Sequence, residues 1–515
     1  MNLKSWGKCF AMLMILGAPA AVSATTSVYP TGTVKYTPEK CWNGFTTLAG
    51  GVPRMVDMNG NLVKEWNTGV NGFPAKPLPG GEILTTGKRW HGGLVDDGVT
   101  VSQLNWNDKE VFAFKKYLEV PVDFTNPTGA KQWVSTQHHD LQKKGNPVYY
   151  TPAVKSSTKP GVTLVLGHKW HKNPKINDNL LMDDTMYEVD ENGKVIWEWV
   201  AADHFDEFGL DDDAKKALKG WHPAKGKEAK GFDWWHQNCA SYLGPNKWYD
   251  AGDKRFHPDN IILDSREANV LCIVDRQTGK VVWRMGPDYW HGKDAKIKQI
   301  LGPHHTHMIP AGLPGAGNIL VYDNGGQAGY GKGTSLSHKG IANIQRFYSR
   351  VLEIDPITRR IVWEYSINSI KGIWKLFGYK EFSPFISGSQ RLPNGNTLIC
   401  EGANGRFIEV TRDLEVVWEY ISPYEGNIPG TNYVYRAYRS PYEWTPQVAK
   451  PREVAVVPPE NASFQIPNVE GKRPLVKGIA KAQAIGGISM TGDEEAPVVE
   501  EEEDDDEDVA TMPAY

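Results

Sequence analysis

The chain has 515 residues, of which 11% are aromatic and 23% are charged, and it contains 52 glycines and 34 prolines. This composition argues against a bundle of long helices, and it is typical of short strands separated by glycine and proline turns. The formal net charge is −4, but 12 acidic residues lie at 493–508 without a basic neighbour. The rest of the chain is mildly basic, which suits an anionic small molecule and is too weak to indicate nucleic acid.

The first residues have the parts of a secretory signal peptide. Lys4 and Lys8 form a basic start, an apolar run follows at Phe10–Leu16, and small residues end at Ala24. We therefore expect residues 1–24 to be cleaved and the protein to be periplasmic or secreted. We expect no membrane span, because this run is too short and no later stretch reaches about 18 apolar residues.

Export permits disulfides, but the sequence cannot pair the cysteines that would remain after cleavage. Two of them lie in apolar stretches, which is typical of buried thiols. Disulfide formation therefore stays open for Cys41, Cys239, Cys272 and Cys400.

One segment recurs along the chain: a few apolar residues, a tight turn, and a second run that often reads Val-Trp-Glu. Each copy alternates apolar and polar residues as a β-hairpin does. The copies are Met55–Trp66, Leu104–Phe114, Tyr187–Trp199, Leu271–Met285, Val351–Tyr365 and Phe407–Tyr420. Their alignment places at one position Lys64, Phe112, Trp197, Trp283, Trp363 and Trp418.

A second apolar segment lies between the copies, as in Pro258–Asp264 and Gly315–Asp323. Each repeat thus holds about four short strands, and six such repeats indicate an all-β fold, a six-bladed β-propeller. A tandem of flat β-sandwiches is the alternative, but it does not explain the recurring order of the two segments. We expect the propeller at residues 51–445, after a lead-in at residues 25–50.

Insertions lengthen several repeats. The run that begins at Asp211 predicts a short helix with an aspartate cap, whereas Lys169–Asp183 and Gly325–Ala342 are expected to be polar loops on the rim. The aromatic segment Tyr433–Gln447 is expected to pack on the last blade. Residues 446–490 indicate an irregular extension, and residues 491–515 a disordered acidic tail.

Polar residues that enter the innermost strands of a propeller crowd one mouth of its channel. If the second segments are those strands, three histidines hold equivalent places just before them: His139, His236 and His304. Phe73 and Ser387 hold the same place in other repeats. Arg266 ends the strand Ile261–Ser265, so we expect it to reach the same centre.

Six segments resemble the bacterial arylsulfate sulfotransferase family, whose members transfer sulfate without a nucleotide donor. They lie within residues 50–445 and read HHDLQKKGNP, DWWHQN, IILDSR, HHTHMIPAGLPGAGNILVYDNGG, LPNGNTLICEGANGRFIEV and YRAYRSPYEW. The resemblance implies a six-bladed propeller with one transiently sulfated histidine, two further histidines and an arginine. It places the nucleophile on His304, the supporting histidines on His236 and His139, and the arginine on Arg266.

These residue types suit sulfuryl transfer. Like phosphoryl transfer, the reaction has a loose transition state with charge spread over three oxygens, so positioning and electrostatics dominate. A neutral imidazole is a competent nucleophile, and an arginine fork can bind two sulfate oxygens. The other histidines would transfer protons to and from phenols.

Four neighbouring residues are candidates for substrate binding: Asn238, His138, His305 and His307. The sequence leaves open which member of His304/His305 and of His138/His139 is the functional one. The run His138-His139-Asp140 also suggests a metal, but no recognised ligand spacing supports it. We therefore expect no metal and no other cofactor.

The chain departs from the better-known members of that family. Its lead-in leaves no room for their separate N-terminal β-domain, so the oligomeric state stays open. It lacks their closely spaced cysteine pair and the histidine that often follows the arginine. An insertion at Gly244–His257 separates His236 from Arg266.

The leading expectation is an exported aryl sulfotransferase that works by a ping-pong mechanism through a sulfohistidine. Its partners would be a small aryl sulfate donor and a phenolic acceptor. One alternative is a quinoprotein-like propeller dehydrogenase, although such enzymes usually have more blades, a bound quinone and Ca²⁺. The other is an exported propeller without enzymatic activity that binds a partner or glycan.

Overall fold

A computed structural model of the chain describes residues 31–66, 73–87, 100–122, 128–222, 231–366, 382–426 and 430–458. The chain divides into two units, Met1–Val457 and Pro458–Tyr515. All of the second unit except Pro458 lies outside the described residues, as does the predicted signal peptide. The predictions of a signal peptide at residues 1–24 and of a disordered tail at residues 491–515 therefore stay predictions.

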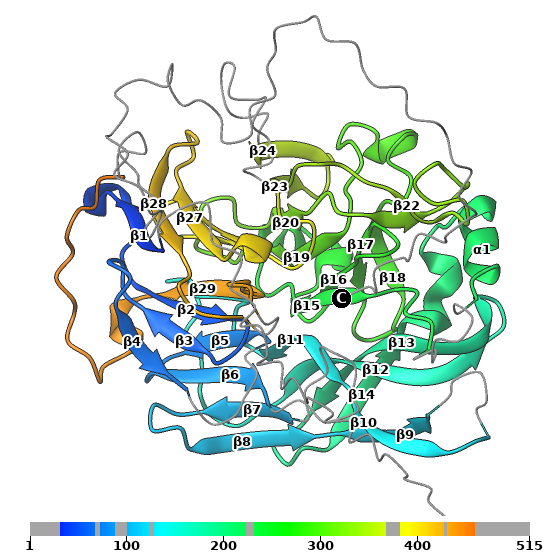
Figure 1. Ribbon diagram of the computed structural model, residues 1–515, viewed down its shortest axis with the longest axis horizontal. Helices are drawn as coiled ribbons and strands as arrows, with labels where there is room; N and C mark the ends of the chain where they lie inside the picture. The colour runs from blue at the N-terminus through cyan, green and yellow to red at the C-terminus, as the bar shows by residue number, and fades with distance from the viewer. Residues whose placement is uncertain are drawn as a thin grey trace, which may run out of the picture. The chain divides into compact units, whose positions relative to one another are not determined.

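Six antiparallel sheets form a ring in the first unit, which confirms the six-bladed β-propeller (Figure 1). The strands of the first three blades, from the innermost outward, are β29 (Arg436–Ser440), β2 (Phe45–Ala49), β3 (Arg54–Val56) and β4 (Leu62–Glu65); β5 (Ala75–Leu78), β6 (Glu82–Thr86), β7 (Thr100–Leu104) and β8 (Glu110–Lys115); and β11 (Gln137–Lys143), β12 (Thr163–Asn173), β13 (Asn177–Val189) and β14 (Val195–Val200). Those of the other three are β15 (Gln237–Tyr242), β16 (Ile261–Ser265), β17 (Val270–Val274) and β18 (Val281–Met285); β19 (Pro303–Met308), β20 (Ile319–Asp323), β23 (Arg350–Asp355) and β24 (Arg360–Ser366); and β25 (Gly388–Arg391), β26 (Thr397–Glu401), β27 (Arg406–Val410) and β28 (Val416–Ile421).

The predicted repeat is the outer hairpin of each blade. The residues aligned from the sequence hold equivalent positions in the strand pairing of each hairpin: Trp197 pairs with Glu188, and Trp418 pairs with Glu409. A register shift follows directly in each of these hairpins, as it does in the other four. The repeat seen in the sequence is therefore a repeat of strand pairing.

Both ends of the first unit close the ring. Strand β29 pairs with β2 and completes the first blade from inside, while β1 (Gly32–Tyr36) pairs with β28 at the outer edge of the sixth (Figure 1). The Tyr433–Gln447 segment packs against the last blade, as predicted, but it also contains β29 and so completes the first blade. The lead-in at residues 25–50 contributes two strands, β1 and β2, to the ring.

The insertions add short helices and hairpins. Helix α1 (Asp212–Lys219) has the predicted cap, in which the Asp211 side chain accepts from the Ala214 N–H at 2.7 Å. The other additions are α2 (Lys247–Asp250), the hairpins β9 (Tyr117–Pro121) with β10 (Lys131–Ser135) and β21 (Ala328–Tyr330) with β22 (Ile341–Ile344), and 3-10 turns at Pro38–Lys40, Ala201–Glu207, Lys254–Phe256, Gly292–Asp294, Gly402–Asn404 and Tyr442–Trp444. The polar loop predicted at Lys169–Asp183 is instead mostly the long β12–β13 hairpin, whose strands pair from Thr163 to Asn173.

Apolar side chains fill the spaces between blades, but the innermost strands are polar and buried. Their free edges are satisfied from the next blade: Gln142 accepts from the Tyr242 N–H at 3.0 Å, and Gln390 accepts from the Arg439 N–H at 2.7 Å. Segments such as Ile261–Ser265 are therefore second strands, so the interpretation of them as inner strands was wrong. The histidine motifs themselves begin or form the innermost strands.

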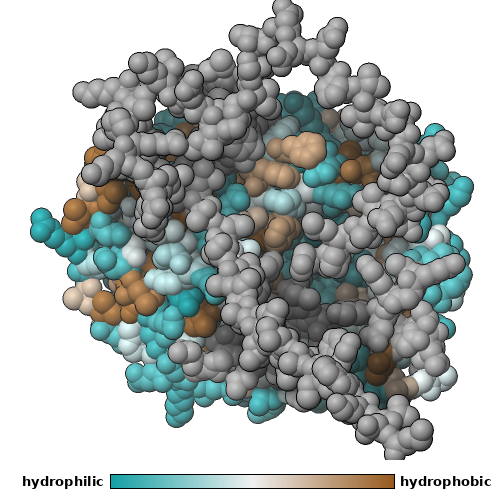
Figure 2. Space-filling view, in the orientation of Figure 1, coloured by the Kyte–Doolittle hydropathy of each residue, from teal (hydrophilic) through white to brown (hydrophobic). Residues whose placement is uncertain are grey.

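One face of the molecule is mostly hydrophilic where the structure describes it. In the view of Figure 2, hydrophilic residues cover most of the described rim, with small hydrophobic patches between them. No helix among the described residues is long and apolar enough to cross a membrane. The thiols are free at Cys41, Cys239, Cys272 and Cys400.

Candidate functional site

The structure brings together the three histidines predicted for the site. They lie at the starts of three neighbouring innermost strands: His139 in β11, His236 directly before β15 and His304 in β19. The rings of His139 and His236 meet edge to face, with their centroids 5.2 Å apart. Burial lowers the pKa of His139 most, and the neighbouring His138 lowers it next. His236 and His304 lower it further, so the three predicted histidines are close enough to influence one another electrostatically.

Irregular backbone aims these side chains. His139 and His236 adopt left-handed conformations, with φ of 53° and 48°, and His305 beside His304 has φ of 52°. Residues other than glycine rarely adopt positive φ, and such conformations concentrate at functional sites. All three innermost strands also shift register near these residues. Bulges of this kind re-aim side chains at the end of a strand.

The imidazole of His304 has a defined tautomer. Its Nδ1 lies 2.8 Å from the side-chain oxygen of Asn324 and 3.0 Å from the Gly302 carbonyl oxygen. Both partners are acceptors, so Nδ1 carries the proton. Burial first, and then the charge of Arg266, lower the pKa of His304 well below its usual 6.5. His304 is therefore neutral, with its lone pair on Nε2.

That lone pair has a partner: the Ile386 N–H donates to Nε2 of His304 at 3.1 Å. Ile386 and the next residue, Ser387, both have positive φ, at 54° and 87°. Ser387 holds the place in the sixth blade that the sequence made equivalent to the histidines. The turn before β25 thus covers the nitrogen that the sequence nominates as nucleophile.

His236 has a different partner behind its ring. Oδ2 of Asp233 lies 2.5 Å from Nδ1 of His236. Burial acts to raise the pKa of Asp233, but the attraction of His236, with smaller contributions from His168 and His138, outweighs it and the pKa is lowered. Asp233 is thus an ionised acceptor, which places a proton on Nδ1 of His236.

Arg266 lies beside His236 and His304. Its backbone N–H donates to the carbonyl oxygen of His236 at 3.0 Å, and its guanidinium contacts Glu267. Among the described residues, the buried Nε of Arg266 has no hydrogen-bond partner. A guanidinium that keeps one buried, unsatisfied donor beside its ion pair with Glu267 is suited to bind an anion.

Aromatic side chains form a wall beside His139. Phe73 stacks on Tyr435, with ring centroids 3.8 Å apart and planes inclined by 27°. Both rings also meet the His139 ring, at 5.4 Å and 5.6 Å. Phe73, Tyr435 and Ile386 belong to one buried apolar cluster. The site therefore joins histidines and an arginine to a surface suited to an aryl ring.

The remaining candidates bind protein partners. The Asn238 amide donates to the Pro303 carbonyl oxygen at 3.2 Å. Nδ1 of His305 accepts from the Ser389 N–H at 3.2 Å, and Nε2 of His307 lies 3.0 Å from the Tyr149 hydroxyl. The Asn238 and His305 contacts join neighbouring blades, and the His307 contact joins the fifth blade to the loop after β11. Substrate binding by these three residues stays a prediction.

Sequence reasoning missed the partners behind the histidines. Asp233 lies three residues before His236, a spacing that could have drawn attention to it. Asn324 lies in the Asp-Asn-Gly-Gly loop after β20. It reaches His304 because β20 pairs with β19, so the end of β20 lies next to the start of β19. His168 and Asp184 lie in β12 and β13, far in sequence from the histidines, and no pattern singled them out.

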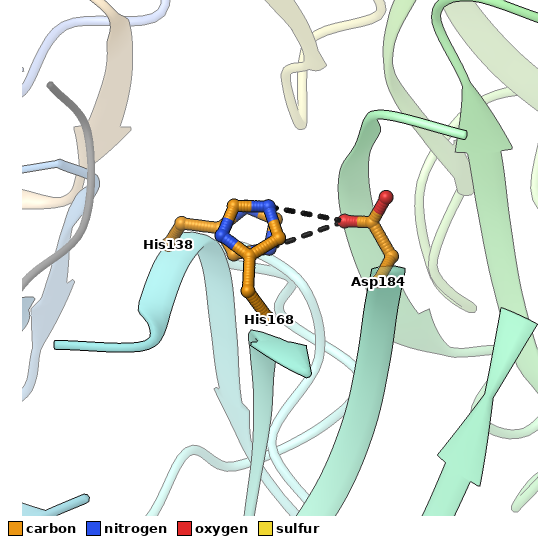
Figure 3. Close-up of side chains that lie close together, drawn as sticks. All are labelled: His138, His168 and Asp184. Carbon is orange, nitrogen blue, oxygen red and sulfur yellow. Dashed lines mark ion pairs between the residues drawn. The ribbon is translucent and has the colours of Figure 1, made fainter. Parts of the chain in front are cut away.

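The metal alternative based on Asp140 does not fit its contacts. Asp140 forms ion pairs with Lys76 at 2.7 Å and with Arg436 at 3.2 Å. A different group of metal-ligand types occurs in the third blade, where one atom each of His138, His168 and Asp184 lie within 4.8 Å of one another (Figure 3).

Solved structures resemble the chain at low identity. A protein of unknown function from Bacteroides caccae is 12% identical, over 77% of this chain and 98% of that one, with a TM-score of 0.40. The Cps50 (Swd1) β-propeller domain of Myceliophteria thermophila is 10% identical, over 78% and 90%, with a TM-score of 0.34. Virginiamycin B lyase from Staphylococcus aureus is 9% identical, over 77% and 86%, with a TM-score of 0.29. These values carry no argument about function.

No curated protein sequence matches the chain. The family model described as Arylsulfotransferase (ASST) matches residues 155–428, which is more than half of the chain. This range includes His236, Arg266 and His304, and it confirms the resemblance seen in the motifs. The chain belongs to the arylsulfotransferase (ASST) family.

Proposed function

We propose that the protein transfers a sulfuryl group from an aryl sulfate to a phenol by a ping-pong mechanism, with His304 as the covalent carrier. One observation carries this proposal most directly. In a chain of the arylsulfotransferase family, His304 is a neutral imidazole with its Nδ1 proton held by Asn324 and with Arg266 beside it. A neutral, oriented imidazole next to an anion-binding group is what attack on a sulfate ester requires.

In the first half-reaction, Nε2 of His304 attacks the sulfur of the donor. The N–S bond forms while the ester S–O bond breaks, and the leaving phenolate takes a proton from His236. Arg266 binds the sulfuryl oxygens, where charge is spread in the transition state. Asp233 supports this role of His236 because its carboxylate stabilises the charged ring from behind.

In the second half-reaction, a phenolic acceptor gives its proton to a neutral histidine, His236 or His139. The acceptor oxygen attacks the sulfur, the N–S bond breaks, and the electron pair returns to Nε2 of His304. When His236 takes this proton, it regains the one that it gave up in the first half. When His139 takes it, the proton passes to His236 before the next cycle, and the two rings lie side by side for that transfer. No redox cofactor or nucleotide is needed for this balance.

The partners behind the rings support this division of roles. A neutral amide, Asn324, lies behind the proposed nucleophile, whereas a carboxylate, Asp233, lies behind the proposed acid and base. A nucleophile needs its lone pair at neutral pH, whereas a proton carrier must hold positive charge. Exchange of the two partners would impair both functions.

The aryl part of the substrates would lie against Phe73 and Tyr435. These rings flank His139 and offer an apolar surface next to the polar centre. Attack also requires the Ile386 N–H to release Nε2 of His304, so substrate binding would move the turn before β25. Export of the enzyme remains part of the proposal, because it rests on the N-terminal residues alone.

The test is acceptor-dependent release of 4-nitrophenolate from 4-nitrophenyl sulfate by the purified protein. We expect release that depends on phenol, and its loss in His304→Ala. The exposed His291 provides a matched control, because His291→Ala changes a histidine away from the innermost strands. Undiminished transfer by His304→Ala would contradict the assignment of the nucleophile.

A further inference from the structure

Three polar side chains gather next to His139 in the third blade. They come from adjacent strands of the third blade: His138 from β11, His168 from β12 and Asp184 from β13 (Figure 3). All three are buried, and Asp184 is completely inaccessible. Oδ1 of Asp184 lies 3.1 Å from Nε2 of His138 and 3.9 Å from Nε2 of His168.

A metal ion is the first occupant to consider for two histidines and a carboxylate. However, the rings of His138 and His168 stack face to face, with centroids 3.7 Å apart and planes inclined by 13°. The nitrogen lone pairs lie in the ring planes, so here they run in nearly parallel planes. A bound zinc ion needs lone pairs that converge at about 2.0–2.1 Å. The arrangement suits protons better than a metal.

The position of these protons follows from the contacts. Oδ1 of Asp184 and Nε2 of His138 lie within ion-pair distance but are not aligned as a hydrogen bond. The negative charge of the ionised carboxylate still favours an N–H over a lone pair at Nε2 of His138, so we place the proton there. Nδ1 of His138 then has the lone pair. It lies 2.5 Å from Nδ1 of His139, a contact that requires one proton between the two nitrogens. That proton belongs to His139, and Nε2 of His139 has the lone pair.

We propose that Asp184 and His138 form a proton relay that fixes the tautomer of His139 and directs its basic Nε2 to the site of sulfuryl transfer. The inference rests on the proposed function and deepens it: Asp184 and His138 are positioning residues, and His139 is the base for the acceptor. When Nε2 of His139 takes the phenolic proton, its Nδ1 proton can pass to His138. The positive charge then lies next to a carboxylate.

The surroundings hold Asp184 for this role. The Gln237 N–H donates to its second oxygen at 3.0 Å, which ties the carboxylate to the fourth blade. Charged and titratable groups face Asp184 from every side, namely His138, His168, Asp233, His236 and Tyr330. Burial raises the pKa of Asp184 to about 7; Asp233 acts in the same direction, and His168 and His236 oppose it. The relay therefore works only above that pH, because a neutral carboxyl no longer holds the proton on His138.

The direct test reads the tautomers in the full-length protein by long-range ¹H–¹⁵N NMR after ¹⁵N-histidine labelling. Signals are assigned with His138→Asn and His139→Asn. At pH 8 we expect the proton of His139 on Nδ1 and that of His138 on Nε2. A proton on Nε2 of His139 would overturn the relay. Because this readout needs no turnover, it stands apart from the proposed function.

Kinetics of Asp184→Asn give the second test. We expect the burst of 4-nitrophenolate from the first half-reaction to be retained and the acceptor-dependent rate to fall at least tenfold, with loss of its acid limb near pH 7. Asp183→Asn is the matched control, because Asp183 is equally buried but binds Trp234 and His171 instead. If the acceptor-dependent rate falls equally in Asp184→Asn and Asp183→Asn, Asp184 has only a structural role and the relay is overturned.

Zinc binding tests the alternative that these residues form a metal site. A titration of the wild-type protein with Zn²⁺, followed by calorimetry, should show no stoichiometric binding that depends on His168. A one-to-one zinc complex that is lost in His168→Asn would overturn the relay in favour of a metal site.

Discussion

The side-chain oxygen of Asn324 lies 2.8 Å from Nδ1 of His304, on the far side of the ring from Nε2. The same amide donates to the carbonyl oxygens of Ser383 and Ile386, at 2.7 Å and 2.8 Å. The Ile386 N–H in turn donates to Nε2 of His304. One amide therefore orients the proposed nucleophile and holds the turn that covers it.

Asn324→Ala tests whether Asn324 orients His304 or only contributes to packing. It removes the acceptor for Nδ1 and two donor contacts, so the free energy of unfolding should fall by about 1–3 kcal/mol. The sulfuryl transfer rate should fall as well, because His304 loses its fixed tautomer. Stability is measured by urea denaturation, and the rate with 4-nitrophenyl sulfate.

Asn318→Ala is the control for that variant. Asn318 is a nearly buried amide that donates to Glu353 at 2.7 Å, away from the histidines. It should lose stability without losing rate. A rate in Asn324→Ala that equals the rate in Asn318→Ala would contradict the orienting role.

Asp233→Asn should slow transfer in a way that depends on the donor. Without the carboxylate, the positive charge of a protonated His236 loses its stabilising partner, so the proton donor is less available; general acid catalysis contributes roughly 10²–10⁴ in rate. A poor leaving group needs the proton most, so the loss should be greatest for sulfates of weakly acidic phenols. The measurement is kcat over a series of aryl sulfates. Equal losses across the series, or none, would argue against this role.

Arg266→Lys should not rescue the site, although it keeps the charge. A lysine presents one point charge instead of a planar fork and cannot bind two sulfuryl oxygens at once. We expect kcat/KM for the donor to fall roughly 10²-fold, comparable to the loss of one oxyanion donor. Arg255→Lys, in the exposed Asp253 pair, should leave it unchanged.

The buried histidines should make the propeller sensitive to acid. Burial lowers the pKa of four of them, that of His307 to about 3: His139, His304, His305 and His307. Unfolded histidines bind protons near pH 6.5 while these do not, so their stability contribution is complete above about pH 6.5 and decreases as the pH falls through that value.

Three buried carboxyls with raised pKa values act in the opposite direction. The pKa of Asp184 is raised to about 7 and that of Asp264 to about 6, both first by burial, and that of Asp183 is also raised. Their contribution is present at low pH and is lost as the pH rises through the folded pKa. We therefore expect the melting temperature to fall between pH 7.5 and pH 5.5, and less steeply in His307→Gln. A rising melting temperature would contradict this balance.

The sequence predicted the ring and the convergence of the histidines because both depend on repetition. The aligned position of Trp197 and Trp418 is a true register position, and His139, His236 and His304 meet because their strands are neighbours. The innermost strands themselves were missed. They face a polar channel and are paired by side chains of the next blade, so they lack the apolar pattern that marks a buried strand.

The relay was missed for another reason. His168 and Asp184 lie in a long hairpin whose polar residues resemble a loop, and their distance from His139 depends on pairing across β11, β12 and β13. Neither periodicity nor motif spacing encodes such a contact. The closing role of β29 was likewise hidden, because only the ring geometry leaves a place for it in the first blade.

The central claim is a sulfuryl group carried on His304, and it can be measured directly. The purified protein is mixed with 4-nitrophenyl sulfate without acceptor, quenched at alkaline pH, digested and analysed by mass spectrometry. The account predicts one added SO₃ on the peptide that contains His304, which disappears when phenol is added before the quench. Sulfation of His236 or His139 instead, or turnover without any sulfated peptide, would contradict it.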